Sequence, residues 1–307
     1  MALDPFDPHA ETGAFLRTRR ARLTPQEVGL PAYGRHRRVP GLRREELAQL
    51  AGVSVAYLTR LEQGRGHNVS AEVLGALSRA LRLTDTEHEH LTRLAKCHRT
   101  NRQPAPLPSQ QRVRPALREM LTSLDGVPAY VTGWRSDLLA WNRTATALFG
   151  DWDQLPPRER NWARLLFLGP DSRRLFKDWE PQAAAAVGAL RLHASCRPDD
   201  PALRSLVDEL STASDDFARL WSHHDVKEQH HGTTRLHHPL VGDLTLSYET
   251  LQLPDGSDQT LTIHHTQPAT PASENLRLLT SWGTTAPDES PSPVDATPWE
   301  RSLRPER

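Results

Sequence analysis

Paired histidines are the side chains in this sequence that most readily suggest metal chemistry. His223-His224, His230-His231 and His237-His238 recur every seven residues, and His264-His265 follows them. Imidazole is a common zinc ligand, but adjacent residues of a strand point to opposite faces, so the two members of a pair cannot bind one ion together. No cysteine or carboxylate completes a known zinc spacing. We therefore expect no bound metal and interpret these histidines as packed or solvated.

Catalytic motifs give no better match. The sequence contains no Gly-rich phosphate loop, no Gly-x-Ser-x-Gly elbow and no His-Glu-x-x-His pair. We therefore expect a protein that is not an enzyme and that has no certain cofactor.

The charge distribution of the chain is uneven. The 307 residues carry 38 basic and 38 acidic side chains, but residues 1–103 carry 17 basic and 11 acidic ones. The first third of the chain is thus the part suited to contact phosphates.

Residues 42–63 predict two short helices joined by a tight turn. The apolar spacing of the first helix ends at Ala51, and Leu58 and Leu61 repeat that spacing on the second. Gly52 lies between them, where a tight turn requires a positive φ. Two helices joined in this way form a helix-turn-helix, whose second helix can enter the major groove of DNA.

Three more helices complete this predicted domain. The first spans residues 11–23, the second begins after Ser70, and the third begins after Thr84. Ser70 is a typical N-cap, and Thr84 with Glu87 forms a capping box. The four arginines at 17, 19, 20 and 22 form either a solvated helix face or a set of phosphate contacts. A basic loop over residues 24–41 is a further candidate for phosphate contact.

Gly-Leu-Arg-Arg-Glu-Glu-Leu-Ala-Gln-Leu-Ala-Gly-Val-Ser, followed by Tyr-Leu-Thr-Arg-Leu-Glu-Gln-Gly-Arg, resembles the lambda-repressor-like (XRE-type) helix-turn-helix. More narrowly it is similar to bacterial MmyB-like regulators, over residues 11–96. His67-Asn68 departs from relatives that tend to carry Pro there, which affects only a loop. The resemblance implies that the DNA contacts come from Arg43, Arg44, Ser54, Val55, Ala56, Tyr57 and Arg60.

Among these residues, Arg60 is the best candidate to read a base. Its planar guanidinium matches the O6 and N7 acceptors of guanine, and Val55 and Ala56 suit a thymine methyl group. Arg43 and Arg44, at the start of the preceding helix, suit the phosphate backbone. The alternative for Arg60 is an ion pair with a nearby glutamate, or solvent.

The chain from residue 113 onward predicts an α+β domain. A Pro-rich linker over residues 100–112 precedes it. Helices are expected to about residue 124 and over 142–149, 158–168, 171–190 and 201–221, and strands over 127–132, 136–141, 226–231, 234–241, 244–249 and 259–266, with Gly232 as the turn between the third and fourth strands. Strands, then helices, then antiparallel strands are typical of a PAS-like domain. The expected fold is therefore multidomain: an all-α lambda-repressor-like helix-turn-helix domain over residues 11–99 and an α+β PAS-like domain over residues 113–281.

Leu-Ala-Trp-Asn, Phe-Leu-Gly-Pro, Trp-Ser-His-His-Asp-Val and His-Pro-Leu-Val-Gly-Asp-Leu-Thr-Leu-Ser-Tyr-Glu are similar to runs of MmyB-like ligand-binding domains. The resemblance implies a cavity for a hydrophobic effector, such as a fatty-acid-like molecule. Most aromatic residues here are expected to be core. The candidates for ligand contact are Trp141, Asn142, Phe149, Trp162, Phe176, Trp221, His224 and Tyr248, with Arg235 as a further polar candidate.

Together these features predict a cytoplasmic, sequence-specific transcriptional regulator. Its expected partners are double-stranded DNA, a second copy of itself and a small-molecule effector, without a membrane. Residues 1–10 and 282–307 are expected to be disordered. The alternative is a ligand-independent DNA-binding module whose second domain binds a protein partner.

Overall fold

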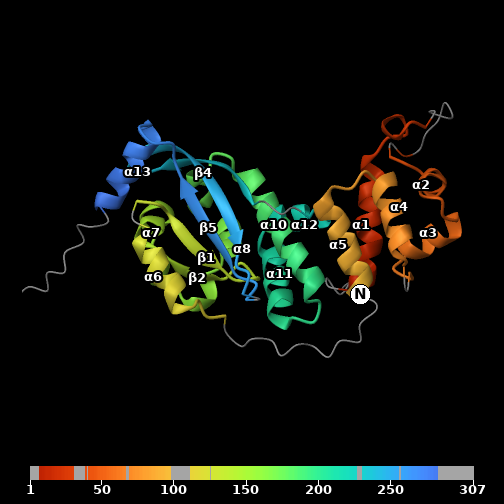
Figure 1. Ribbon diagram of the computed structural model, residues 1–307, viewed down its shortest axis with the longest axis horizontal. Helices are drawn as coiled ribbons and strands as arrows, with labels where there is room; N and C mark the ends of the chain where they lie inside the picture. The colour runs from red at the N-terminus through yellow and green to blue at the C-terminus, as the bar shows by residue number, and fades with distance from the viewer. Residues whose placement is uncertain are drawn as a thin grey trace, which may run out of the picture.

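The computed structural model describes residues 7–30, 39, 41–66, 69–97, 111–124, 126–226, 230–255 and 257–282. Most of the expected linker over residues 100–112 and of the expected disordered tail falls outside these ranges. So do the four basic residues at 35–38 of the expected phosphate-contacting loop. Within the described ranges the chain forms two domains that lie side by side (Figure 1).

The first domain is built from five helices. They are α1 (Pro8–Arg22), α2 (Arg44–Ala51), α3 (Val55–Glu62), α4 (Ala71–Ala80) and α5 (Asp85–Cys97). Both expected caps are present, because the Ser70 hydroxyl accepts a hydrogen bond from the Val73 N–H, and Thr84 and Glu87 bond each other's backbone N–H. The start of α1 differs from the prediction, which had residues 1–10 disordered. Asp7 caps this helix and Pro8 occupies its first turn, so the helix begins at Pro8.

The second domain contains one antiparallel sheet covered by helices on both faces. Its strands are β1 (Ala129–Thr132), β2 (Leu138–Trp141), β3 (His231–His238), β4 (Gly242–Gln252) and β5 (Thr260–His265), in the spatial order β2-β1-β5-β4-β3. Its helices are α6 (Pro115–Ser123), α7 (Arg143–Phe149), α8 (Trp162–Leu168), α9 (Ser172–Leu175), α10 (Trp179–Cys196), α11 (Pro201–Ala213), α12 (Asp215–Ser222) and α13 (Pro271–Trp282). This is the α+β architecture that the sequence predicts.

The prediction of a turn at Gly232 is wrong. Gly232 lies inside β3 and is paired with Tyr248 of β4. A Cβ at Gly232 would come within 2.8 Å of the Tyr248 hydroxyl oxygen, so this glycine makes room for a neighbouring aromatic side chain. The actual turn follows His238 and ends at Gly242, which has a φ of 74°.

Two helices predicted as continuous are interrupted. Between α9 and α10 the chain runs alongside β3, where Phe176 bridges to Leu236 and the Lys177 N–H bonds the Arg235 carbonyl. Between α11 and α12, Ser214 has an extended backbone and its hydroxyl caps the next helix at the Phe217 N–H. In both places the apolar residues keep a helical spacing, which is why the sequence predicts one helix. A contact with β3 in the first case and the Ser214 cap in the second end the helix instead.

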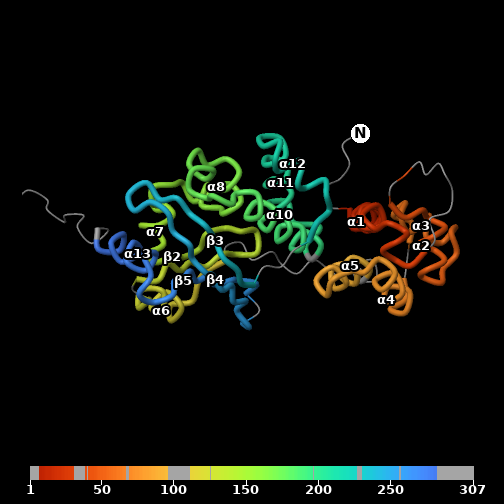
Figure 2. The backbone as a smooth tube through the Cα atoms, turned by 90° about the horizontal axis from the view of Figure 1, so that it is seen from above, coloured from red at the N-terminus to blue at the C-terminus, as the bar shows by residue number. Residues whose placement is uncertain are grey.

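Helix α10 lies between the sheet and the first domain. Figures 1 and 2 show it between the strands and α5, against which it packs. Helix α6 packs on the opposite face, against Val131, Ala140 and Leu261. The described helices include none that is both long enough and apolar enough to cross a membrane.

Candidate DNA-binding surface and ligand cavity

The turn between α2 and α3 fixes the relative position of these two helices. Gly52 has a φ of 65°, and its N–H bonds the carbonyls of Ala48 and Gln49 at the end of α2. Ser54 then starts α3 by accepting a hydrogen bond from the Tyr57 N–H at 3.1 Å. Leu58 is completely buried under this turn. The result is a helix-turn-helix with α3 as its outward-facing second helix.

The residues expected to contact DNA share the exposed side of this unit. Val55 is 39% exposed, although valine is among the residue types most often buried in proteins. Ala56 beside it is also exposed. Arg60 is exposed and its guanidinium carbon lies 5.8 Å from the centroid of the partly buried Tyr57 ring. Ser54 is also exposed, but its hydroxyl is engaged in the helix cap.

The alternative ion pair for Arg60 does not form within the described residues. Glu62 is 1% exposed and accepts hydrogen bonds from Arg20 and Arg44, at 2.7 and 2.6 Å. Glu46 instead accepts a hydrogen bond from the Arg43 backbone N–H. The side chains of Arg43 and Arg44 are exposed at the start of α2, although Arg44 is partly held by Glu62.

The arginines of α1 divide into two that are held by ion pairs inside the structure and two that remain exposed. Arg19 is only 4% exposed and pairs with Glu87 and Asp225. Arg20 pairs with the buried Glu62, and Arg22 pairs with Asp225. Arg19 and Arg20 therefore hold the structure together and are not free for phosphate contacts. Arg17 and Arg22 remain exposed, although Arg17 bonds the Glu62 carbonyl.

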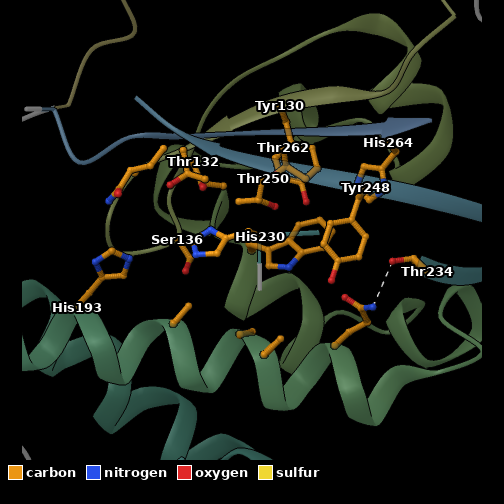
Figure 3. Close-up of a pocket in the computed structure, with 18 of the residues that line it drawn as sticks. Tyr130, Thr132, Ser136, His193, His230, Thr234, Tyr248, Thr250, Thr262 and His264 are labelled. Atoms are coloured by element: carbon orange, nitrogen blue, oxygen red, sulfur yellow. Dashed lines mark hydrogen bonds between the residues drawn. The ribbon is translucent and has the colours of Figure 1, made fainter. Parts of the chain in front are cut away.

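The second domain contains a cavity of about 210 Å³ between α10 and the inner face of the sheet. Figure 3 shows side chains of the sheet facing those of the helix across this space. The helix contributes small residues at a spacing of three or four, which places them on one side: Ala185, Ala186 and Ala189. Trp162 and Phe176 close one end.

Hydroxyl groups dominate the sheet side of the cavity. They belong to Thr132, Thr234, Tyr248, Thr250, Thr260 and Thr262, and Ser136 adds one from the β1–β2 turn. The Gln182 amide donates to the Thr234 hydroxyl at 3.2 Å. Burial lowers the pKa of His193 to about 4 and that of His264 to about 3, so both imidazoles are neutral at pH 7. Burial also raises the pKa of Tyr248 to about 12.

A second cavity of about 220 Å³ lies on the far side of Trp162 and Phe176, which line both. Its other walls are mostly apolar and include Phe149, Trp152 and Leu166. The Trp162 and Phe176 rings meet edge to face, with centroids 6.0 Å apart. Two side chains thus separate a hydroxyl-lined space from an apolar one.

The predicted ligand residues fall into three groups. Trp162, Phe176 and Tyr248 line the first cavity, and Phe149 lines only the second. Trp141 packs against Trp152, outside both.

Asn142 caps α7 through the Ala145 N–H and also bonds the Ala129 N–H, so it joins this helix to β1. Trp221 and His224 lie at the junction with the first domain. Arg235 pairs with Asp178 on the surface.

Sequence reasoning missed the threonines, Gln182, His193 and His264. A signal for some of them was present, because alternate residues of β5 are Thr260, Thr262 and His264, while Leu261 and Ile263 lie between them. Alternation of this kind marks a strand with one apolar and one polar face. In the structure Leu261 packs toward α6, and the polar side chains on the other face line the cavity. In the described ranges, no three histidine, cysteine, aspartate or glutamate residues are grouped so that they could hold a metal ion.

Comparison with known families agrees with this architecture. The family model of the MmyB-like transcription regulator ligand binding domain matches residues 113–279, which is more than half of the chain. The chain belongs to the MmyB-like transcription regulators. A helix-turn-helix domain model matches residues 11–91 of this MmyB-like protein. A search of curated proteins finds no match.

In this MmyB-like regulator, a cluster of buried charges joins the two domains. Glu11 of α1 pairs with Arg191 of α10, and its carboxylate also bonds the His224 ring at 3.0 Å. Arg191 is 1% exposed, bonds the Trp221 carbonyl and lies over the Trp221 ring. Burial acts to raise the pKa of Glu11, but Arg191 and His224 outweigh it and lower that pKa to about 2.

The junction extends along α1. The Arg19 guanidinium donates to the His224 carbonyl at 3.0 Å and pairs with Asp225. Val226, from the second domain, is buried within the apolar core of the first. The DNA-binding and ligand-binding domains of the regulator are therefore connected by specific, largely dehydrated contacts.

Proposed function

We propose that this protein is a sequence-specific transcriptional regulator, and not an enzyme, whose affinity for DNA depends on a small molecule bound between α10 and the sheet. The observation that carries this proposal is that α10 contacts both the cavity and the DNA-binding domain. Ala189 lines the cavity, and Arg191, two residues further on and on the opposite side of the helix, pairs with Glu11 of the DNA-binding domain. A ligand that shifts α10 would therefore act directly on the position of α1.

The mechanism follows from differential binding. A ligand changes DNA affinity only if it prefers one arrangement of the two domains over another. Because Arg191 is buried and Glu11 is only slightly exposed, an arrangement that separated them would leave charges without partners. Such a junction favours two discrete arrangements over a continuous range of positions.

We further propose that the regulator acts as a homodimer in the cytoplasm. One helix-turn-helix reads only a few base pairs, whereas two recognition helices about 34 Å apart would read a two-fold symmetric operator. Sedimentation of the protein as a monomer, both free and on its operator, would exclude the dimer.

The ligand is tested by extraction. Freshly purified protein is denatured, extracted and examined by mass spectrometry for a near-stoichiometric small molecule. A preferred DNA sequence is selected from a random pool, and affinity for it is compared before and after the small molecule is removed. A recovered molecule whose removal changes DNA affinity supports the proposal. An empty second domain with unchanged affinity would favour a protein partner for that domain instead.

A further inference from the structure

The cavity between α10 and the sheet is lined by uncharged groups. Among the described residues that line it there is no lysine, arginine, aspartate or glutamate. His193 and His264 are neutral at pH 7, because burial lowers their pKa values to about 4 and about 3. His230 is exposed, so it belongs to the solvent-facing mouth. Three charged groups act on His193: Asp258 and Arg197 are paired with each other, and Arg93 is paired with Glu89.

The same cavity is rich in hydrogen-bonding groups. The hydroxyls of Thr132, Thr250 and Thr262 face it from the sheet, and the Tyr248 hydroxyl points into it (Figure 3). His264 is 4% exposed, and neither of its ring nitrogens has a hydrogen-bond partner in the protein. An occupant able to bond with the hydroxyls that face this space would be favoured, because a polar group covered by an occupant and left without a partner is costly.

The size and walls of the cavity restrict the occupant further. A cavity of about 150 Å³ is enough to hold benzene, and this one measures about 210 Å³. Its walls include the rings of Tyr130, Trp162 and Phe176, which favour a flat aromatic partner in stacked or edge-to-face contact. A long acyl chain would have to displace Trp162 or Phe176 to reach the second cavity.

We propose that the effector is a neutral aromatic molecule of one or two rings that carries hydroxyl or carbonyl groups, and not a fatty-acid anion. This inference rests on the proposed function. A carboxylate placed inside the cavity, away from its solvent-facing mouth, loses its hydration and meets no opposite charge among the described lining residues. Threonine and tyrosine hydroxyls, in contrast, both donate to and accept from hydroxyl and carbonyl groups.

The test compares two probes of nearly equal size that differ in charge. Binding of 2-naphthol, which is neutral at pH 7, and of 2-naphthoate, which is an anion, is measured on the full-length protein by calorimetry. We expect 2-naphthol to bind at least about tenfold more tightly. Ala189→Leu, which adds bulk inside the cavity, should abolish binding of 2-naphthol while leaving the circular dichroism spectrum unchanged.

A single added positive charge should strengthen binding of the anionic probe. Gln252 lines the cavity but is exposed, so Gln252→Arg can place a guanidinium at the mouth without burying it. This variant should bind 2-naphthoate more tightly than the wild type does, and Gln252→Met, similar in length but uncharged, should not.

Different experimental outcomes would contradict the inference and the proposed function. Equal or tighter binding of 2-naphthoate by the wild type, blocked by Ala189→Leu, would overturn the neutral-ligand inference but leave a functioning ligand site. Lack of binding by both probes up to about 1 mM would also overturn the inference. The proposed function fails only if DNA affinity does not respond to any molecule that occupies the cavity.

Discussion

Arg60 combines exposure with the absence of a carboxylate partner among the described residues. It is held over the Tyr57 ring, while the neighbouring Glu62 is committed to Arg20 and Arg44. This arrangement leaves the five donors of its guanidinium free for DNA and reduces the conformational freedom that binding would remove.

Replacing Arg60 should therefore weaken sequence recognition more than general DNA binding. For Arg60→Ala we expect a loss of about 1–3 kcal/mol in binding to the selected operator and little change on random DNA. Fluorescence anisotropy on both DNAs measures this difference. Arg79→Ala, an exposed arginine on α4, serves as the control. Equal losses on the two DNAs would mean that Arg60 contacts a phosphate.

His264 makes the second domain sensitive to acid. Its pKa is lowered by burial to about 3, whereas an unfolded histidine titrates near 6.5. Below pH 6.5 the unfolded state binds a proton that the folded state does not, so the free energy of unfolding falls by about 1.4 kcal/mol per pH unit until the folded pKa is reached.

The substitution His264→Phe should reduce this dependence between pH 6 and pH 4. All tryptophans lie at position 134 or later, so urea unfolding followed by tryptophan fluorescence reports mainly on the second domain. His265→Phe is the control, since His265 is exposed on the same strand. An unchanged slope in the His264 variant would show that other groups dominate the acid sensitivity.

Replacing glycine by alanine should change the free energy of unfolding in opposite directions at two positions of the first domain. Gly52 adopts a φ of 65° in the α2–α3 turn, and a Cβ there would touch nothing, so Gly52→Ala introduces backbone strain alone. We expect it to lower the free energy of unfolding by about 1–2 kcal/mol.

Gly75 lies inside α4, and a Cβ there would make only ordinary contact with the end of the Arg79 side chain. Gly75→Ala should raise stability by about 0.5–1 kcal/mol. Circular dichroism during chemical unfolding compares the two variants; a Gly52→Ala variant as stable as wild type would argue against strain at the turn.

The elements that sequence predicted best are those set by local chemistry. The caps at Ser70 and Thr84 and the Gly52 turn depend on residues within four positions of each other, and all are present. The errors occurred where a distant contact decides. Gly232 stays in a strand because Tyr248 covers it, and the predicted helix over 171–190 is interrupted beside β3.

The same distinction applies to the ligand cavity. Large aromatic side chains were predicted to contact the ligand. Trp221 instead contributes to the domain junction, and Trp141 packs against Trp152. Short polar residues such as Thr250 and Thr262 are common in strands, and only the three-dimensional arrangement brings them to one face opposite the alanines of α10. The alternation of β5 was one part of this arrangement visible in the sequence.

At the scale of the whole molecule, the junction between the domains has a buried centre and an exposed edge. Glu11 and Arg191 form the centre, whereas Arg22 and Asp225 form a pair that is 45% and 40% exposed at the edge. Exposed ion pairs contribute little, and losing one partner of a buried pair is far more disruptive. The two pairs therefore separate the effect of a charge at the junction from the effect of its burial.

Glu11→Gln should weaken communication between the domains while leaving each binding site intact. Glu11 does not line the cavity, and the Arg191 and His224 side chains that it bonds lie outside it too, so affinity for the effector should be nearly unchanged. The factor by which the effector changes DNA affinity should fall toward one, because Arg191 loses its charged partner on α1. Arg22→Gln, at the exposed edge, should retain most of this factor. Measuring DNA affinity with and without saturating effector gives the factor for each variant; a Glu11→Gln protein that responds like the wild type would show that coupling runs through another contact, such as Arg19 and Asp225.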